Sequence, residues 1–209
     1  AIFGMWYYAR YEGNFLPSPK KTFNPMMLMA IVILVPGTQF AANFIANLTG
    51  YIRPDWLQQY NELFETSGIT DTTFVTVLYS VILAPICEEL IFRGVTMRCA
   101  RKALPFALAN LMQAALFGLF HLNWIQGIYA FALGIVLGYV CECGGSIYYS
   151  MGLHMLFNLW GTLSGFFPDP GNSVVVFVVV IVVTIVSLVV GFVLFNKGRR
   201  KLPINSTGI

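Results

Sequence analysis

Charged side chains are scarce in this chain of 209 residues, where Asp, Glu, Lys and Arg make up only 10% against 57% hydrophobic residues. Between Ala103 and Asn196 the only formal charges are Glu142 and Asp169. Soluble domains carry about 25% charged residues, which cover the surface that meets water. The composition therefore excludes a soluble globular domain and predicts an integral membrane protein.

The alternation of polar and apolar residues that is typical of barrel strands is also missing, because the apolar residues form long continuous runs. A helical run of about 17 to 25 apolar residues matches the hydrocarbon thickness of a bilayer. We therefore predict an all-α fold, a polytopic transmembrane helix bundle of about six spans. The predicted spans are Pro25 to Ala46, Thr72 to Phe92, Leu104 to His121, Trp124 to Val140, Ser146 to Phe166 and Val174 to Phe195.

Lysine and arginine are nearly absent from one side of this predicted bundle. Cytoplasmic flanks collect these residues, and all 12 except Arg53 precede the first span or follow the second or the last. The loop from Asn47 to Asp71 is mainly acidic, which suits an external segment. We therefore expect a multi-pass protein with both termini in the cytoplasm. Topology and contact with membrane lipid account for the net charge of +3, so we expect no nucleic-acid partner.

Histidine is also rare, and the only two, His121 and His154, fall inside predicted spans. The paired Glu88 and Glu89 lie in the second span, and Asn158 follows His154 by four residues on the same helix face. Ionisable groups inside a membrane are costly and usually functional. These residues are therefore the candidates for a site.

The helix ends predict that these side chains meet. Glu88 and His121 are equidistant in sequence from the turn at Leu104, so in an antiparallel hairpin each lies about 25 Å along its helix from that turn. On the fifth helix, His154 and Asn158 lie about 15 and 21 Å from the same side. We therefore expect side chains from three helices to converge on one polar chamber.

The residue types in this chamber indicate peptide hydrolysis by water. Glu89 and Arg93 have the spacing of a helical ion pair, so we expect them to support the structure. Glu88 is then the carboxylate that can act as general base, together with His121. No Gly-x-Ser-x-Gly motif or helical Cys–His pair offers a covalent nucleophile. His154, with Asn158, would donate hydrogen bonds to the oxyanion.

A metal site is the alternative, because Glu88, His121 and His154 are also a catalytic zinc ligand set. The His-Glu-x-x-His spacing is absent, however. Asn158 is also better suited to hydrogen bonding than to binding zinc. We therefore expect no cofactor and keep zinc as the less favoured reading.

Three motifs on these helices resemble those of a known family. Glu88 to Gly94 matches the Glu-Glu-x-x-x-Arg motif of the CAAX protease and bacteriocin-processing (CPBP, or Abi) family. Phe117 to His121 matches its Phe-x-x-x-His motif, and His154 to Asn158 its His-x-x-x-Asn motif. The resemblance covers roughly Thr72 to Gly165 and leaves the first and last spans unassigned.

What the resemblance implies is a glutamate-type intramembrane endopeptidase. Glu88 and His121 would activate water, while His154 and Asn158 would stabilise the oxyanion and Arg93 would be structural. Eukaryotic members trim prenylated CAAX tails, and bacterial members are associated with bacteriocin immunity or with maturation of leader and signalling peptides. The compact chain favours a bacterial member, located in the cell membrane, with a peptide or protein as its substrate.

Residues 1–209 are expected to form one integral membrane domain, with a four-helix catalytic core over residues 72–165. The chain opens with Ala1 and shows no signal-peptide layout, so we expect a processed or truncated product. We expect a peptide to enter laterally or from the cytoplasm, near the basic turn from Arg98 to Lys102.

Two other classes of protein fit the same helices. A non-catalytic membrane scaffold or bacteriocin immunity protein would use the polar cluster only to hold helices together. A small transporter would use buried Glu and His to relay protons, but the sequence offers no inverted repeat or broken-helix pair to support it.

Overall fold

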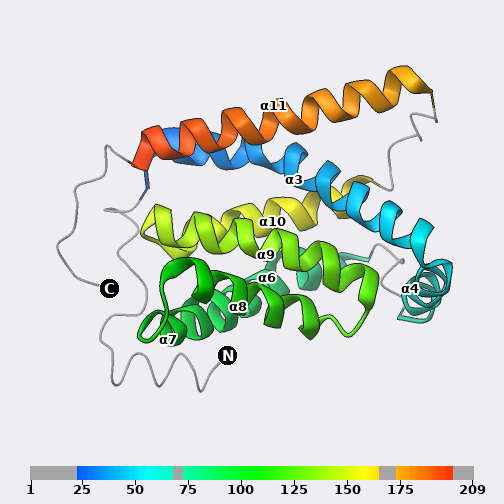
Figure 1. The fold of residues 1–209 in the computed structure, drawn as a ribbon, viewed down its shortest axis with the longest axis horizontal. Coiled ribbons are helices and arrows are strands. Elements are labelled where there is room, and N and C mark those ends of the chain that lie inside the picture. The colour runs from blue at the N-terminus through cyan, green and yellow to red at the C-terminus, as the bar shows by residue number, and fades with distance from the viewer. Residues whose placement is uncertain (1–22, 68–72, 165–172, 200–209) are drawn as a thin grey trace.

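The described part of the chain contains helices and no strands, as the sequence predicts. A computed structural model describes residues 23–67, 73–164 and 173–199. Some predicted features lie outside these ranges. They are the basic residues before the first span and the segment ends predicted at Thr72, Gly165 and Phe166. Figure 1 shows the helices stacked as a bundle, with the last helix along one edge.

The first described helix is longer than predicted. Helix α3 spans Pro25–Ile52 and begins at Asn24, whose side chain accepts a hydrogen bond from the amide of Met26. Proline at the first helical position suits this start because its missing N–H would have no partner there. The predicted end at Ala46 is therefore too early.

A short helix replaces much of the predicted external loop. Helix α4 spans Pro54–Ser67 and follows α3 almost directly. The ring of Trp56 stacks on Trp124, at the start of α9, with centroids 5.3 Å apart. The loop prediction was wrong here because the segment is polar overall, and its one apolar face is too short to read as a span.

The second long helix, Phe74–Arg101, contains two π-helical segments. It runs through α5 (Phe74–Val77), the π-helix η1 (Leu78–Leu83), α6 (Ala84–Glu89), the π-helix η2 (Leu90–Met97) and α7 (Arg98–Arg101). Pro85 lies near the start of α6 and has no N–H to donate, which interrupts the regular hydrogen-bond ladder. The wider turns of a π-helix are often found at functional sites.

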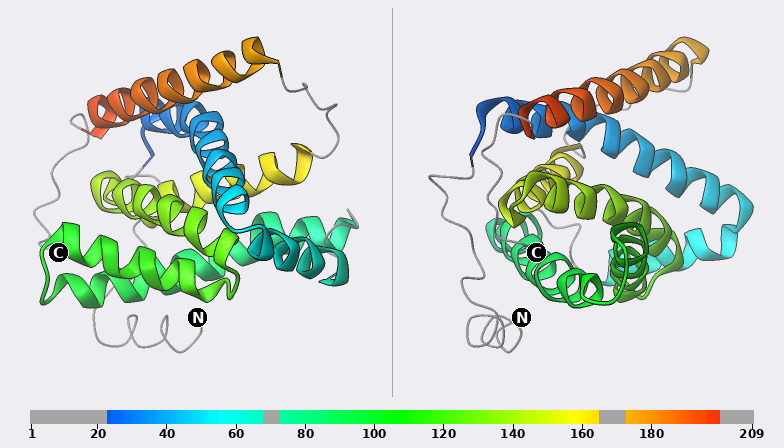
Figure 2. Two further views of the ribbon diagram at one scale, coloured as in Figure 1. Left: turned by 45° about the vertical axis from the view of Figure 1, so that its right-hand side comes forward. Right: turned by 60° about the vertical axis from the view of Figure 1, so that its left-hand side comes forward.

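Three further helices complete the core. Helix α8 spans Phe106–Phe120, α9 spans Trp124–Gly144 and α10 spans Ile147–Ser164. The side chain of Asn123 caps α9, and Gly145 ends it in the left-handed conformation with φ 64°. The short turns make α8, α9 and α10 antiparallel neighbours, as Figure 2 shows.

Helix α11, Val174–Arg199, packs mainly against α3. Figures 1 and 2 show the two helices side by side at one edge of the bundle. The backbone N–H of Gly37 donates to Ser187 Oγ at 2.9 Å, and the Ser187 hydroxyl donates in turn to the carbonyl of Ile33. Most valines of α11 are exposed and apolar, so this helix suits contact with lipid.

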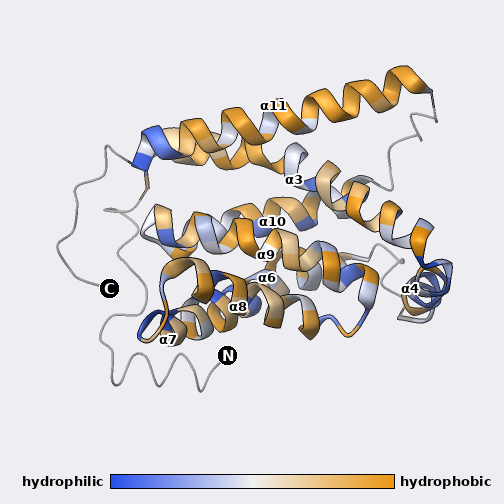
Figure 3. Ribbon diagram, viewed as in Figure 1, coloured by the Kyte–Doolittle hydropathy of each residue, from blue (hydrophilic) through white to orange (hydrophobic). Residues whose placement is uncertain are grey.

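Four described helices are long and apolar enough to cross a membrane. They are Pro25–Ile52, Phe74–Arg101, Trp124–Gly144 and Val174–Arg199. Of the other two predicted spans, Phe106–Phe120 is apolar but has 15 residues, and Ile147–Ser164 is not among the four. Figure 3 shows polar residues interrupting the apolar surface of the inner helices, whereas α11 is almost uniformly apolar.

Small residues let α8 and α9 approach each other closely. A methyl group at Gly118 would lie 2.5 Å from the carbonyl oxygen of Gly127, and one at Gly134 would lie 3.1 Å from Ala114. Backbones in such contact are typical of helix pairs in membranes. The contact holds the end of α8 that carries His121 against the start of α9.

Replacing Gly118 by alanine should therefore destabilise the protein. The new methyl group meets backbone, which has to shift, so we expect Gly118→Ala to cost about 1–3 kcal/mol. Gly152→Ala on α10 is the matched control, because a methyl group there meets nothing within 4 Å. It should be neutral or stabilising. Melting temperatures in detergent micelles test both, and equal effects would contradict the close approach.

Candidate active site

A buried ion pair joins Glu89 and Arg93 on the second long helix. Arg93 Nη1 donates to Glu89 Oε1 at 2.8 Å, and both side chains have 0% exposure. The guanidinium also donates through Nη2 to the carbonyl of Gly134 at 3.2 Å, and it lies 4.5 Å from the ring centre of Phe117. The pair predicted from spacing is thus present, and it ties this helix to α8 and α9.

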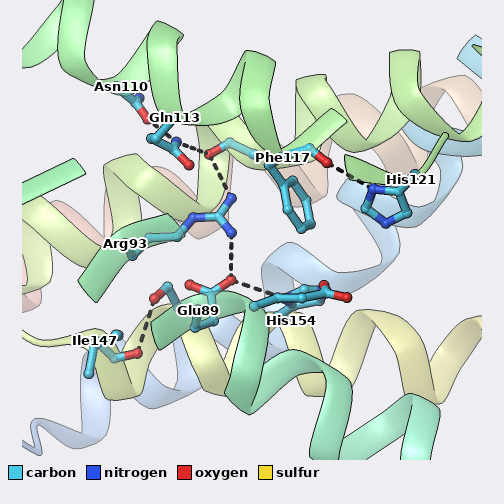
Figure 4. A network of polar contacts seen from close by, with 11 residues as sticks. Glu89, Arg93, Asn110, Gln113, Phe117, His121, Ile147 and His154 are labelled. Carbon is cyan, nitrogen blue, oxygen red and sulfur yellow. Dashed lines mark hydrogen bonds and ion pairs between the residues drawn. The ribbon is translucent and has the colours of Figure 1, made fainter. Parts of the chain in front are cut away.

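A polar network that the sequence analysis missed extends from this pair. Gln113 Nε2 donates to the same carbonyl of Gly134 at 2.9 Å and to Asn110 Oδ1 at 2.7 Å. Asn110 Nδ2 donates to the carbonyl of Ile135 at 3.0 Å. Figure 4 shows Asn110, Gln113, Arg93 and Glu89 in one connected row. The sequence signal for this network was a pair of amide side chains, Asn110 and Gln113, three residues apart in an apolar helix.

His154 lies between the two glutamates. Its Nδ1 is 3.0 Å from Glu89 Oε1, and its Nε2 is 3.6 Å from Glu88 Oε2. Glu89 accepts from Arg93 and is therefore ionised, so the proton of this contact is on Nδ1. The other ring nitrogen, Nε2, is the one that faces Glu88.

His121 is held in a defined tautomer. Its Nδ1 lies 2.9 Å from the carbonyl oxygen of Phe117, one turn earlier on α8. A carbonyl only accepts hydrogen bonds, so Nδ1 carries the proton and Nε2 of the neutral ring is the acceptor. The ring of Phe117 packs edge-on against both His121 and His154, with centroids 5.0 and 5.6 Å away. One aromatic side chain thus positions both imidazoles.

Asn158 contacts the backbone of the first π-helix. Its Nδ2 donates to the carbonyl of Ser80 at 2.8 Å. A primary amide has two N–H donors, so one further N–H of Asn158 can serve a ligand. Spacing in the sequence does not predict this contact, because the contact depends on the winding of η1.

A cavity of about 600 Å³ brings the predicted residues together. Glu88, His121, His154 and Asn158 all line it. Two of these side chains are largely enclosed, because Glu88 is 16% and His154 3% exposed. The remaining wall comes mainly from α3, α4, α5, η1, α9 and the end of α10. Its polar members are Gln39, Asn43, Tyr60, Thr76, Tyr79, Ser80, Gln126, Tyr129, Thr162 and Ser164.

The rim of the cavity lies at the α4 end of the bundle. Leu63 of α4 and Tyr79 of η1 line it with 45% and 59% exposure. Burial raises the pKa of the Tyr60 phenol on α4, which therefore stays a neutral donor at neutral pH. In Figure 1 this end lies opposite α7, which carries the basic turn. Entry of a peptide laterally or from the basic side stays a prediction.

The zinc alternative concerns three side chains that line this cavity. Across residues 23–67, 73–164 and 173–199, no three His, Cys, Asp or Glu side chains are grouped as metal ligands. Glu88, His121 and His154 line one cavity but do not form such a group. We therefore derive no step through a metal.

Comparison with known proteins adds an independent observation. Residues 70–160 match the family described as type II CAAX prenyl endopeptidase Rce1-like. The resemblance inferred from the three motifs is thereby confirmed, and the matched stretch includes Glu88, His121, His154 and Asn158. No curated protein and no solved structure is similar enough to the chain to match it.

The buried ion pair generates a prediction for stability. Arg93→Met leaves Glu89 without its cation in a fully buried position, so we expect it to lower the free energy of unfolding by about 3–5 kcal/mol. The double variant Glu89→Gln with Arg93→Met removes both charges and should lose less than the single variant. Arg53→Met, in an exposed pair with Asp55, is the control and should hardly change the melting temperature. A double variant as unstable as the sum of its parts would contradict this account.

Proposed function

We propose, from the membership of residues 70–160 in the Rce1-like family of CAAX proteases, that this protein is an intramembrane endopeptidase that cleaves its substrate with an activated water molecule. The observation that carries the proposal is the cavity, because the Glu88 carboxylate, both imidazoles and the Asn158 amide line it together. The substrate class is a CAAX-type, leader or bacteriocin peptide. The proposed location is a bacterial cell membrane with both termini in the cytoplasm.

Glu88 is the proposed general base. Its neighbour Glu89 is committed to Arg93, so Glu88 is the carboxylate of the pair that remains available in the cavity. The acceptor Nε2 of His121 would orient the water through one of its hydrogens. The water oxygen attacks the peptide carbonyl carbon while Glu88 takes the other proton. The C–N bond then breaks, and Glu88 returns the proton to the leaving amine.

His154 and Asn158 are the proposed oxyanion donors. This role requires His154 to act as an imidazolium, whose second N–H, on Nε2, would lie in the cavity beside Glu88. The spare N–H of Asn158 lies one helical turn further along the same face. Charge that develops on the carbonyl oxygen would thus meet a cation and a neutral donor that are already in place.

The competing functions make different predictions. A scaffold or immunity protein needs the helix contacts but no general base, so it should keep its function without Glu88. A transporter should move its substrate and release no cleaved product. The buried pair of Glu89 and Arg93 suits all three functions, whereas a carboxylate, Glu88, that lines the same cavity as the acceptor nitrogen of His121 favours hydrolysis.

Glu88→Gln should abolish most of the activity. We expect cleavage of a prenylated CAAX-type peptide or a leader peptide to fall about 10²- to 10⁴-fold, because the base is lost. Glu142→Gln is the control, since Glu142 pairs with Arg101 and does not line the cavity. Mass spectrometry of the products, with and without a chelator, measures both. Activity that survives Glu88→Gln refutes the mechanism, and loss on chelation refutes its metal-free form.

Asn158→Ala should slow the chemical step and leave substrate binding nearly unchanged. Loss of one oxyanion donor typically lowers kcat by about 10²- to 10³-fold. Thr162→Val is the control, because Thr162 lines the cavity one turn later but its hydroxyl donates to its own helix. A rise in KM at constant kcat for Asn158→Ala would instead assign this residue to substrate binding.

A further inference from the structure

Gln39 of α3 is a buried amide that the proposed chemistry does not use. Its side chain is 7% exposed and lines the cavity together with Asn43, one turn later on the same helix. Both residues lie outside the stretch that matches the Rce1-like family. A buried amide in an apolar helix costs free energy unless its donors and acceptor find partners.

Most of the hydrogen-bonding capacity of this amide is unused. Gln39 Nε2 donates to Asn43 Oδ1 at 3.4 Å, which is long for such a bond. No group in the part of the chain that the structure describes donates to Gln39 Oε1, which is out of contact with solvent. Amides in this state are expected to be satisfied by a ligand or an ordered water molecule.

The position of Gln39 relates it to the site of cleavage. A methyl group at Gly161 of α10 would lie 3.9 Å from Gln39 Nε2, so this amide faces α10. Gly161 follows the proposed oxyanion donor Asn158 by nearly one helical turn, which is about 5 Å along the axis. An extended peptide advances about 3.3 Å per residue. If the scissile carbonyl of a bound peptide lies at Asn158, Gln39 is therefore level with a peptide group one or two residues away along the substrate.

We infer that Gln39 binds a backbone peptide group of the substrate, one or two residues from the scissile bond on the rim side of the cavity. A primary amide complements a peptide group, because its N–H donates to the peptide carbonyl and its oxygen accepts from the peptide N–H. Rotation about the last side-chain torsion, which is soft in glutamine, presents both atoms to the cavity. Gln39 is thus a binding residue, and this role rests on the proposed peptidase function.

Backbone recognition has a consequence for specificity. A peptide group is common to all residue types, so Gln39 would hold the substrate in an extended conformation without selecting its side chains. Selection would then depend on the apolar walls of the cavity, which include Leu133 and Phe157. One amide on α3 would align many hydrophobic sequences with the same catalytic groups.

The first test combines variants of the enzyme with a change in the substrate. We expect Gln39→Leu, and the equally long Gln39→Met, to raise KM for a prenylated CAAX-type peptide about tenfold, with kcat changed less than about twofold. An ester in place of the peptide N–H at one of the two positions next to the scissile bond should raise KM similarly in the wild type. It should add nothing further in Gln39→Leu, because both changes remove the same hydrogen bond.

Thr38→Val is the matched control. Thr38 is 6% exposed on the same helix, and its hydroxyl donates only to the carbonyls of Leu34 and Val35. It should leave KM unchanged. Gln39→Leu should also melt no lower than the wild type, because it removes an unsatisfied buried polar group. A lower melting temperature with unchanged KM would assign Gln39 a structural role and overturn the inference.

Binding measurements separate failure of this inference from failure of the proposed function. The same peptide is titrated into the Glu88→Gln protein with and without Gln39→Leu. Cleavage by the wild type together with binding that is indifferent to Gln39 overturns this inference alone. Binding that depends on Gln39 without any cleavage by the wild type overturns the peptidase and leaves a peptide-binding site. Neither cleavage nor binding overturns both.

Discussion

The ion pair between Glu89 and Arg93 has no access to solvent, so water cannot stabilise either charge. Each therefore depends on the other and on the carbonyl of Gly134, to which Arg93 also donates. Glu89 accepts from His154 as well, and this contact fixes the imidazole beside Glu88. The orientation of His154, one of the proposed catalytic groups, thus follows from one buried electrostatic contact.

The cavity beside this ion pair results from the way in which the helices wind and pack. The glutamates lie on a short α-helical segment between two π-helical segments, and the first of these supplies the carbonyl of Ser80 to Asn158. Close approach of α8 and α9 at Gly118 and Gly127 brings the end of α8 inward. A cavity is left between these inner helices and α3 and α4. The helices that match the family thus carry the proposed catalytic residues, and α3 and α4 form the opposite wall of the cavity.

Spacing along one helix was a reliable guide, because such contacts depend only on the helical repeat. The four-residue steps from Glu89 to Arg93 and from His154 to Asn158 were read directly from the sequence. Contacts between helices could not be read from the sequence in this way. The bond from Gln113 to Gly134 and the contact of Gln39 with α10 depend on the rotation of each helix about its axis. Hydrophobic runs in a membrane protein do not specify that rotation.

The sequence by itself indicated a lipid environment, an all-helical class and the family that residues 70–160 resemble, because composition and short motifs are properties of single segments. It also marked the few ionisable residues that a bilayer tolerates only in protected positions. Tertiary structure alone decided which atoms face one another. The placement of His154 between two carboxylates, the contact of Asn158 with Ser80 and the cavity wall from α3 and α4 all arise where separate helices pack, and packing is a property of the whole bundle.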